Sequence, residues 1–190
     1  MKVSKITELD CTARAYLQWG VKNGIYGSSS FSDRYFDLGS KQNIDPLIAA
    51  AEARSRMYGE QALRLMFPGA TIKQETYFSN WDITVITDGK TLRVEVKLRE
   101  GEYTYSKLCN DIPYINKEKS ESINSLENGY LLTISSDLVA ILSEANATSG
   151  TVEYWASEVT YSDSDKVCKD RVLYPVEKAT SIKQLDEICL

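Results

Sequence analysis

Three charged residues in the middle of the chain, Asp82, Glu95 and Lys97, are the strongest candidates for a reactive site. Twelve residues separate the aspartate from the glutamate, and Lys97 follows Glu95 after a single valine. Carboxylate oxygens are the ligands that hard divalent cations such as Mg²⁺ and Mn²⁺ prefer. The pattern therefore indicates a divalent-metal site with an ammonium group beside it.

The chain contains no histidine, which narrows the chemistry further. Catalysis by Ser-His-Asp or Cys-His groups and zinc binding through imidazole are excluded. Any hydrolysis must rely on carboxylates, lysine, tyrosine or a metal ion held by oxygen ligands. A magnesium site built from carboxylates satisfies this restriction.

A β-hairpin is expected to bring the three residues together. Residues 81–87 and 90–99 both have the residue pattern of strands, and Asp88-Gly89 lies between them. Asp-Gly between two such segments is a strong signal for a tight hairpin turn. The two segments are therefore predicted to be antiparallel neighbours.

The register of this hairpin places Asp82 opposite Glu95, with their Cβ atoms roughly 5 Å apart. Two like charges in that position are destabilising unless a cation lies between them. Glu95 and Lys97 share one face of their strand, because side chains alternate. The same pattern is also typical of the solvent-facing side of an antiparallel sheet, so both interpretations stand at this stage.

The rest of the chain predicts both helices and strands. The clearest helix begins at Asp45-Pro46 and ends at Met66, since Asp is a good N-cap and Pro suits the first helical position. A buried strand is expected at residues 130–134. Further helices are expected within residues 1–24, 114–128 and 138–145 and from Ser181 to the C-terminus, and further strands at 70–78, 151–161 and 171–176.

Length and composition favour one α/β domain. A chain of 190 residues can bury a single core without disulfides. The four cysteines form no C-x-x-C pair and are interpreted as reduced thiols, and no apolar segment is long enough for a membrane span. The formal net charge of −5 means that binding of nucleic acid would need a locally basic face.

The string formed by Asp82, Glu95, Val96 and Lys97 resembles the D…(D/E)-x-K core of the PD-(D/E)XK nuclease superfamily. This family places its motif on a β-hairpin after a helix with an acidic residue, and Glu60 is similar to that residue. Trp81 stands where the family has proline. The resemblance covers about residues 46–135, and residues 1–45 and 136–190 remain unassigned.

The resemblance implies a restriction endonuclease-like fold, with a central mixed sheet built on a hairpin and flanked by helices. It also implies that Asp82, Glu95 and the Val96 carbonyl hold Mg²⁺ or Mn²⁺, with Glu60 as a further ligand. Lys97 would orient the attacking water and stabilise charge on the phosphate. Glu60 also fits an alternating charge ladder on the helix surface with Glu52, Arg56 and Arg64.

The expected activity is hydrolysis of DNA phosphodiester bonds in the cytoplasm, in phage replication, recombination or defence. Arg99 and Lys119 are candidate phosphate contacts, although residues of these types are more often ordinary solvated charges. Cutting both strands of a duplex would suit a homodimer. The alternatives are a nuclease that acts on RNA and a catalytically silent module that binds nucleic acid or protein, such as a virion component.

Overall fold

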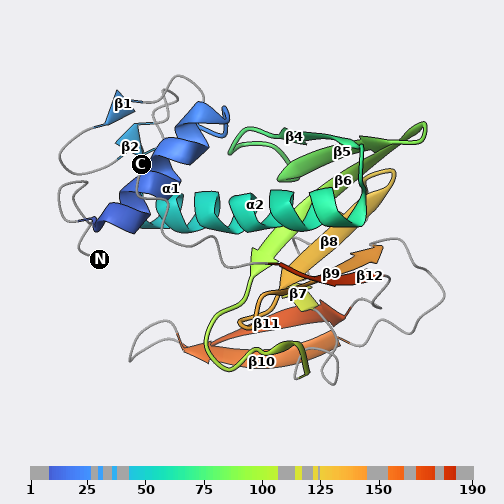
Figure 1. Ribbon diagram of the computed structural model, residues 1–190. Coiled ribbons are helices and arrows are strands. Elements are labelled where there is room, and N and C mark those ends of the chain that lie inside the picture. Colours follow the sequence, from blue (N-terminus) through green and yellow to red (C-terminus); the bar gives the residue numbers. More distant parts are fainter. Residues whose placement is uncertain are drawn as a thin grey trace.

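The computed structural model contains two helices and three β-sheets in its described residues (Figure 1). The described residues are 9–26, 30–31, 36–37, 43–106, 114–116, 122–123, 125–144, 154–160, 166–173 and 178–182. The largest sheet has six strands, both parallel and antiparallel, and helix α2 covers one of its faces. The predicted α/β class with a central mixed sheet is confirmed.

Helix α2 (Pro46–Met66) has the bounds that the sequence predicts. The Asp45 side chain accepts a hydrogen bond from the Leu47 amide at 2.8 Å, and Pro46 occupies the first turn. The side facing the protein carries small residues, including Ala49, Ala53 and Ala62, all fully buried. Small side chains let the helix approach helix α1 (Cys11–Lys22) closely at Ala49 and Ala53 and the sheet closely at Ala62.

The six-stranded sheet has the order β12-β9-β8-β6-β5-β4. Only β6 and β8 run parallel to each other, and all other neighbours are antiparallel. The strands are β4 (Thr71–Gln74), β5 (Ile83–Thr87), β6 (Lys90–Leu98), β8 (Gly129–Ile134), β9 (Val139–Glu144) and β12 (Lys178–Ser181).

The predicted hairpin is formed by β5 and β6. Thr87 pairs with Lys90, and the ladder continues to the pair of Ile83 and Val94. Asp88 and Gly89 both have positive φ angles, 42° and 76°, as the tight turns of hairpins require. Strand β8 lies in the interior of the sheet and is largely buried, as expected for residues 130–134.

The main core lies between α2 and this sheet. Tyr58 and Leu63 of the helix pack against apolar side chains of the strands, including Ile83 and Val94. A Cβ atom on Gly59 would lie 2.9 Å from a methyl carbon of Val96. The glycine therefore permits α2 to lie against β6 next to the candidate site.

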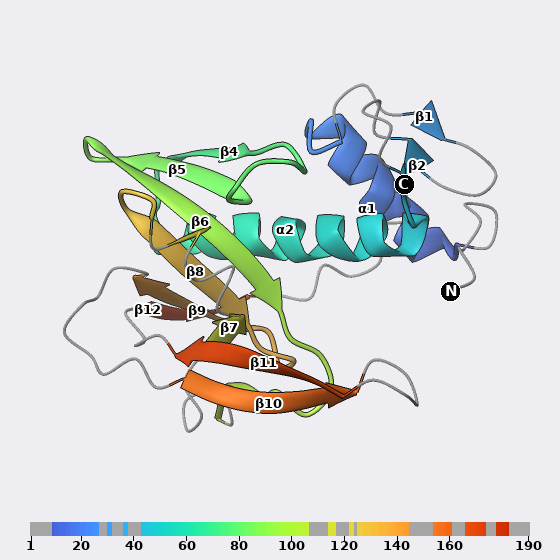
Figure 2. The same ribbon diagram turned by 180° about the vertical axis from the view of Figure 1, so that it is seen from behind.

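Helix α1 (Cys11–Lys22) packs on α2 and forms a second apolar cluster with it. Two small sheets complete the described structure, and Figures 1 and 2 show them at opposite ends of the molecule. Near α1 are β1 (Ser30–Phe31), β2 (Phe36–Asp37) and β3 (Asn43–Ile44). The other sheet comprises β7 (Tyr114–Asn116), β10 (Tyr154–Thr160) and β11 (Lys166–Leu173).

One predicted helix is wrong, and a second is wrong at its start. Residues 138–145 were predicted as a helix, but Val139–Glu144 forms strand β9. The helix predicted at 114–128 is wrong at its start, where Tyr114–Asn116 forms strand β7 paired with β11, whereas residues 122–123 are helical as predicted. The C-terminal helix lies outside the described residues except at Ser181 and Ile182, where Ser181 ends strand β12. Neither described helix is both long and apolar enough to cross a membrane.

Candidate active site

Asp82 lies immediately before β5, at the point where that strand begins to pair with β6. Its main-chain amide donates to the Val94 carbonyl at 2.9 Å. Its carboxylate Oδ2 accepts a hydrogen bond from the Val96 amide at 2.7 Å. The side chain thus binds a β6 amide beyond the last residue of the β5–β6 ladder, and this fastens Asp82 beside the Glu95-Val96-Lys97 segment.

Glu95 and Lys97 lie on the face of β6 opposite Val94 and Val96, whose side chains pack against α2. Glu95 is only 1% exposed. Its Oε1 atom lies 2.7 Å from the Lys97 Nζ atom, and the lysine side chain keeps 36% of its surface exposed. The lysine therefore connects a buried carboxylate with the protein surface.

The two carboxylates affect each other electrostatically. Burial raises the pKa of Asp82, and the nearby charge of Glu95 raises it further, against the opposing effects of Arg56 and Lys97. Burial alone would lower the pKa of Lys97, but Glu95, Asp82 and Glu52 together raise it. Asp82, Glu95 and Lys97 thus form one interacting group, as their spacing predicts.

Arg56 of α2 is a fourth member of this group, and it was not a candidate in the sequence analysis. The residue is 2% exposed, and its Nη2 atom lies 2.9 Å from Asp82 Oδ1. Its Nη1 atom donates to the main-chain carbonyls of Glu75, at 2.7 Å, and Asp82, at 3.2 Å. One guanidinium therefore joins α2 to the chain on both sides of the turn between β4 and β5.

Glu52 is also connected to the site and was likewise missed. Its Oε1 atom accepts from Arg56 Nε at 2.8 Å, one helical turn away. The charge ladder on α2 suggested a solvated surface for both residues. One sequence signal could have indicated that Arg56 is buried. It lies three residues from both Ala53 and Gly59, which puts it on the small-residue face of the helix.

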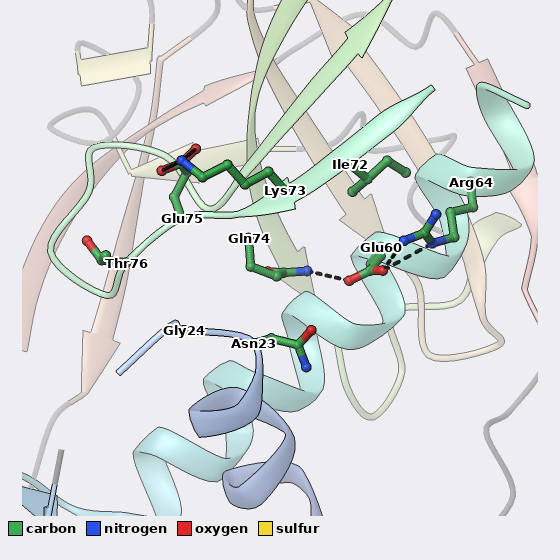
Figure 3. A pocket seen from close by; sticks show the side chains of 9 residues that line it. All are labelled: Asn23, Gly24, Glu60, Arg64, Ile72, Lys73, Gln74, Glu75 and Thr76. Atoms are coloured by element: carbon green, nitrogen blue, oxygen red, sulfur yellow. Dashed lines mark hydrogen bonds and ion pairs between the residues drawn. The ribbon is translucent and has the colours of Figure 1, made fainter. Parts of the chain in front are cut away.

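Glu60 points into a different part of the molecule. Its Oε1 atom accepts from Arg64 Nη2 at 2.6 Å, and its Oε2 atom accepts from Gln74 Nε2 at 2.9 Å (Figure 3). These residues line a cavity of about 370 Å³ between the end of α1, helix α2 and strand β4. The structure does not bring Glu60 together with Asp82 and Glu95.

A second cavity, of about 450 Å³, lies between α2 and the C-terminal end of β6. Its lining includes Glu52 and Arg54 from α2, Lys97 from β6 and the segment that follows β6. Arg99, a candidate phosphate contact, also lines it. Lys119, the other candidate, lies outside the described residues.

The donors at the hairpin suit a divalent cation. Asp82 Oδ2 accepts one hydrogen bond, Oδ1 forms an ion pair with Arg56, each oxygen retains a further lone pair, and Glu95 adds a second carboxylate. Glu52, Asp82 and Glu95 outnumber Arg56 and Lys97, which leaves one negative charge in excess. In the described part of the chain, no three acidic or cysteine side chains are placed to share a metal ion. Main-chain oxygens such as that of Val96, and water, would complete the coordination.

No protein-family model matches the sequence, and neither a curated protein nor a solved structure shows significant similarity to it. The resemblance to the PD-(D/E)XK nucleases thus rests on Asp82, Glu95 and Lys97 and on the hairpin that carries them.

Proposed function

We propose that this protein is a divalent-metal-dependent nuclease that hydrolyses DNA phosphodiester bonds. One observation carries the proposal: the carboxylate of Asp82 is fastened to the Val96 amide, between Glu95 and Lys97 of the neighbouring strand. Two buried carboxylates with an ammonium at the edge of a cavity supply oxygen ligands and a phosphate contact in one place.

Each residue of the site would have a distinct role in the reaction. Asp82 and Glu95, with the Val96 carbonyl, would hold Mg²⁺ or Mn²⁺, and the ion would supply a polarised phosphoryl oxygen and a water of lowered pKa. Lys97 would donate a hydrogen bond to a phosphate oxygen or orient the water, because its ammonium lies beside Glu95 and reaches the cavity. Arg56 would hold Asp82 in place from the opposite side.

Nucleic acid as the substrate is supported by the cations in the lining of the second cavity. Arg54, Lys97 and Arg99 line the cavity together with only two acidic residues, Glu52 and Glu100. This contrasts with the net charge of −5 for the whole chain. A DNA-cutting enzyme of this kind would act in the cytoplasm of a bacterial or phage-infected cell, in replication, recombination or defence, and two copies would be needed to cut both strands together.

A second function, binding without turnover, is favoured by the contacts of Asp82. Arg56 already neutralises this carboxylate, and the described residues offer no third acidic ligand beside Asp82 and Glu95. A module that binds nucleic acid or protein would keep the buried ion pairs for stability alone. The two functions differ in whether metal ions support cleavage.

Cleavage assays distinguish the two functions. Supercoiled, linear and single-stranded DNA and RNA are incubated with Mg²⁺, Mn²⁺ or EDTA, using the wild type, Asp82→Ala and Lys97→Ala. We expect metal-dependent cutting of DNA that each substitution lowers by about a hundredfold or more, since loss of one preorganised group at a phosphate has that order of effect. Lys73→Ala, which removes an exposed lysine on β4, is the matched control.

Thermal melting accompanies these assays, because Asp82 is buried and its loss also destabilises the fold. Cutting that survives both substitutions in folded protein, or no cutting with either metal, would reject the nuclease and favour the binding module.

A further inference from the structure

The cavity beside Lys97 has the dimensions and lining of a binding site for a small polar group. Its volume of about 450 Å³ lies within the usual range for small-molecule sites and is too small for a segment of double helix. Lys97, Arg54 and Arg99 contribute cations, and Leu98 and Ile48 contribute apolar surface. A phosphate with an attached aromatic base needs both kinds of surface.

One wall of this cavity includes Tyr103, in the segment after β6. The Tyr103 carbonyl accepts from the Ser136 amide at 2.9 Å, and the Tyr105 amide donates to Asp137 Oδ1 at 2.7 Å. These bonds fix the segment to the turn between β8 and β9. The tyrosine is therefore held at the cavity by hydrogen bonds of its own carbonyl and of the Tyr105 amide two residues later.

An ion pair connects two elements of the cavity wall. Arg54 Nη1 lies 2.7 Å from Glu100 Oε1, and the two side chains are 39% and 72% exposed. Ion pairs with this exposure contribute little to stability, because water competes for both charges. A phosphate group entering the cavity can replace Glu100 as the partner of Arg54, since it also offers negatively charged oxygen acceptors.

We infer that this cavity receives one nucleotide of an unpaired DNA strand, with its phosphate at Arg54 and Arg99 and its base against Tyr103. A base offers its face to an aromatic side chain only when it is unstacked from its neighbours. The net charge of −5 for the whole chain also disfavours a duplex, because a duplex presents two phosphate backbones over a wider surface. The inference specifies the substrate of the proposed nuclease and rests on it for the site, but binding can be measured without cleavage.

The test measures fluorescence anisotropy of a labelled DNA decamer, of its duplex and of an RNA decamer, in EDTA and 0.1 M salt. Tyr103→Ala should weaken binding of the single strand about tenfold, because one base–aromatic stack is lost, and Tyr103→Phe should restore it. Glu100→Gln should strengthen it about fivefold, since Arg54 becomes available to one more phosphate. Glu127→Gln, an exposed charge change near the opposite end of β6, should have no effect.

Equal or tighter binding of the duplex, tighter binding of the RNA decamer, or equal effects of Glu100→Gln and Glu127→Gln would overturn the inference. Binding of the single strand by Tyr103→Ala with the affinity of the wild type would also overturn the inference. Binding with the expected changes but no cleavage would reject the proposed nuclease alone. Cleavage that is lost in Asp82→Ala but unchanged in Tyr103→Ala and Glu100→Gln would reject this inference alone.

Discussion

Helix α2 carries two pairs of identical composition and spacing, Glu52 with Arg56 and Glu60 with Arg64. In both pairs the arginine follows the glutamate by four residues. The distance from a guanidinium nitrogen to the glutamate Oε1 atom is 2.8 Å in the first pair and 2.6 Å in the second. Arg56 is 2% exposed, whereas the Arg64 side chain is 58% exposed. The first pair contacts Asp82 at the hairpin, and the second lines the cavity of Figure 3.

The two pairs differ because of what lies opposite each on the tertiary fold. Arg56 faces the junction of β4 and β5, where two main-chain carbonyls accept its hydrogen bonds and the Asp82 carboxylate forms an ion pair with it. Arg64 remains in water, where an ion pair of this kind contributes only about 0.3–0.5 kcal/mol. A charged residue on a helix thus becomes structural when its removal would leave another buried charge without compensation.

Replacing each arginine by methionine tests this comparison most directly. Arg56→Met should lower the free energy of unfolding by about 3–5 kcal/mol, because Asp82 would remain buried without its cation. Arg64→Met should change it by less than about 0.5 kcal/mol. Urea denaturation followed by circular dichroism measures both values. Similar values for the two variants would mean that burial does not separate the pairs.

Replacing the two glutamates by glutamine compares the pairs at the proposed metal site. Glu52→Gln removes the negative charge in excess and loosens Arg56, so we expect Mn²⁺ to bind about tenfold more weakly. Glu60→Gln should cause a smaller loss, because its carboxylate binds Arg64 and Gln74 instead. Titration calorimetry with Mn²⁺ gives the affinities. A larger loss for Glu60→Gln would restore the role that the family resemblance suggests for this residue.

Gly59 lies between the two pairs and determines how closely α2 approaches β6. An added methyl group would contact Val96 and Ile83, so Gly59→Ala should destabilise the protein by about 1 kcal/mol despite the better helix propensity of alanine. Ala51→Gly, at an exposed position of the same helix, isolates the propensity effect. Thermal melting compares the two variants. A stabilising Gly59→Ala would show that the helix tolerates a methyl group at this contact.

The sequence predicted the elements that local signals define. The cap at Asp45, the turn at Asp88-Gly89 and the apolar segment of β8 act within a few residues, and all three were found as predicted. The helix predicted at residues 138–145 was wrong because a short apolar segment suits a helix or a buried strand equally. Leu138 adopts a positive φ of 59°, and Ser135 binds the Val139 amide, which starts a strand beside β8.

The sequence by itself determined the chemistry available to this protein: carboxylates and a lysine at hairpin spacing, with no histidine. The alternation of side chains along a strand is enough to place Glu95 and Lys97 on one face. Only the tertiary structure decided that Arg56 and Glu52 join them while Glu60 does not. The reason is physical, since the partner of a helical charge depends on which distant strand lies opposite it, and the spacing along the helix is the same in both cases.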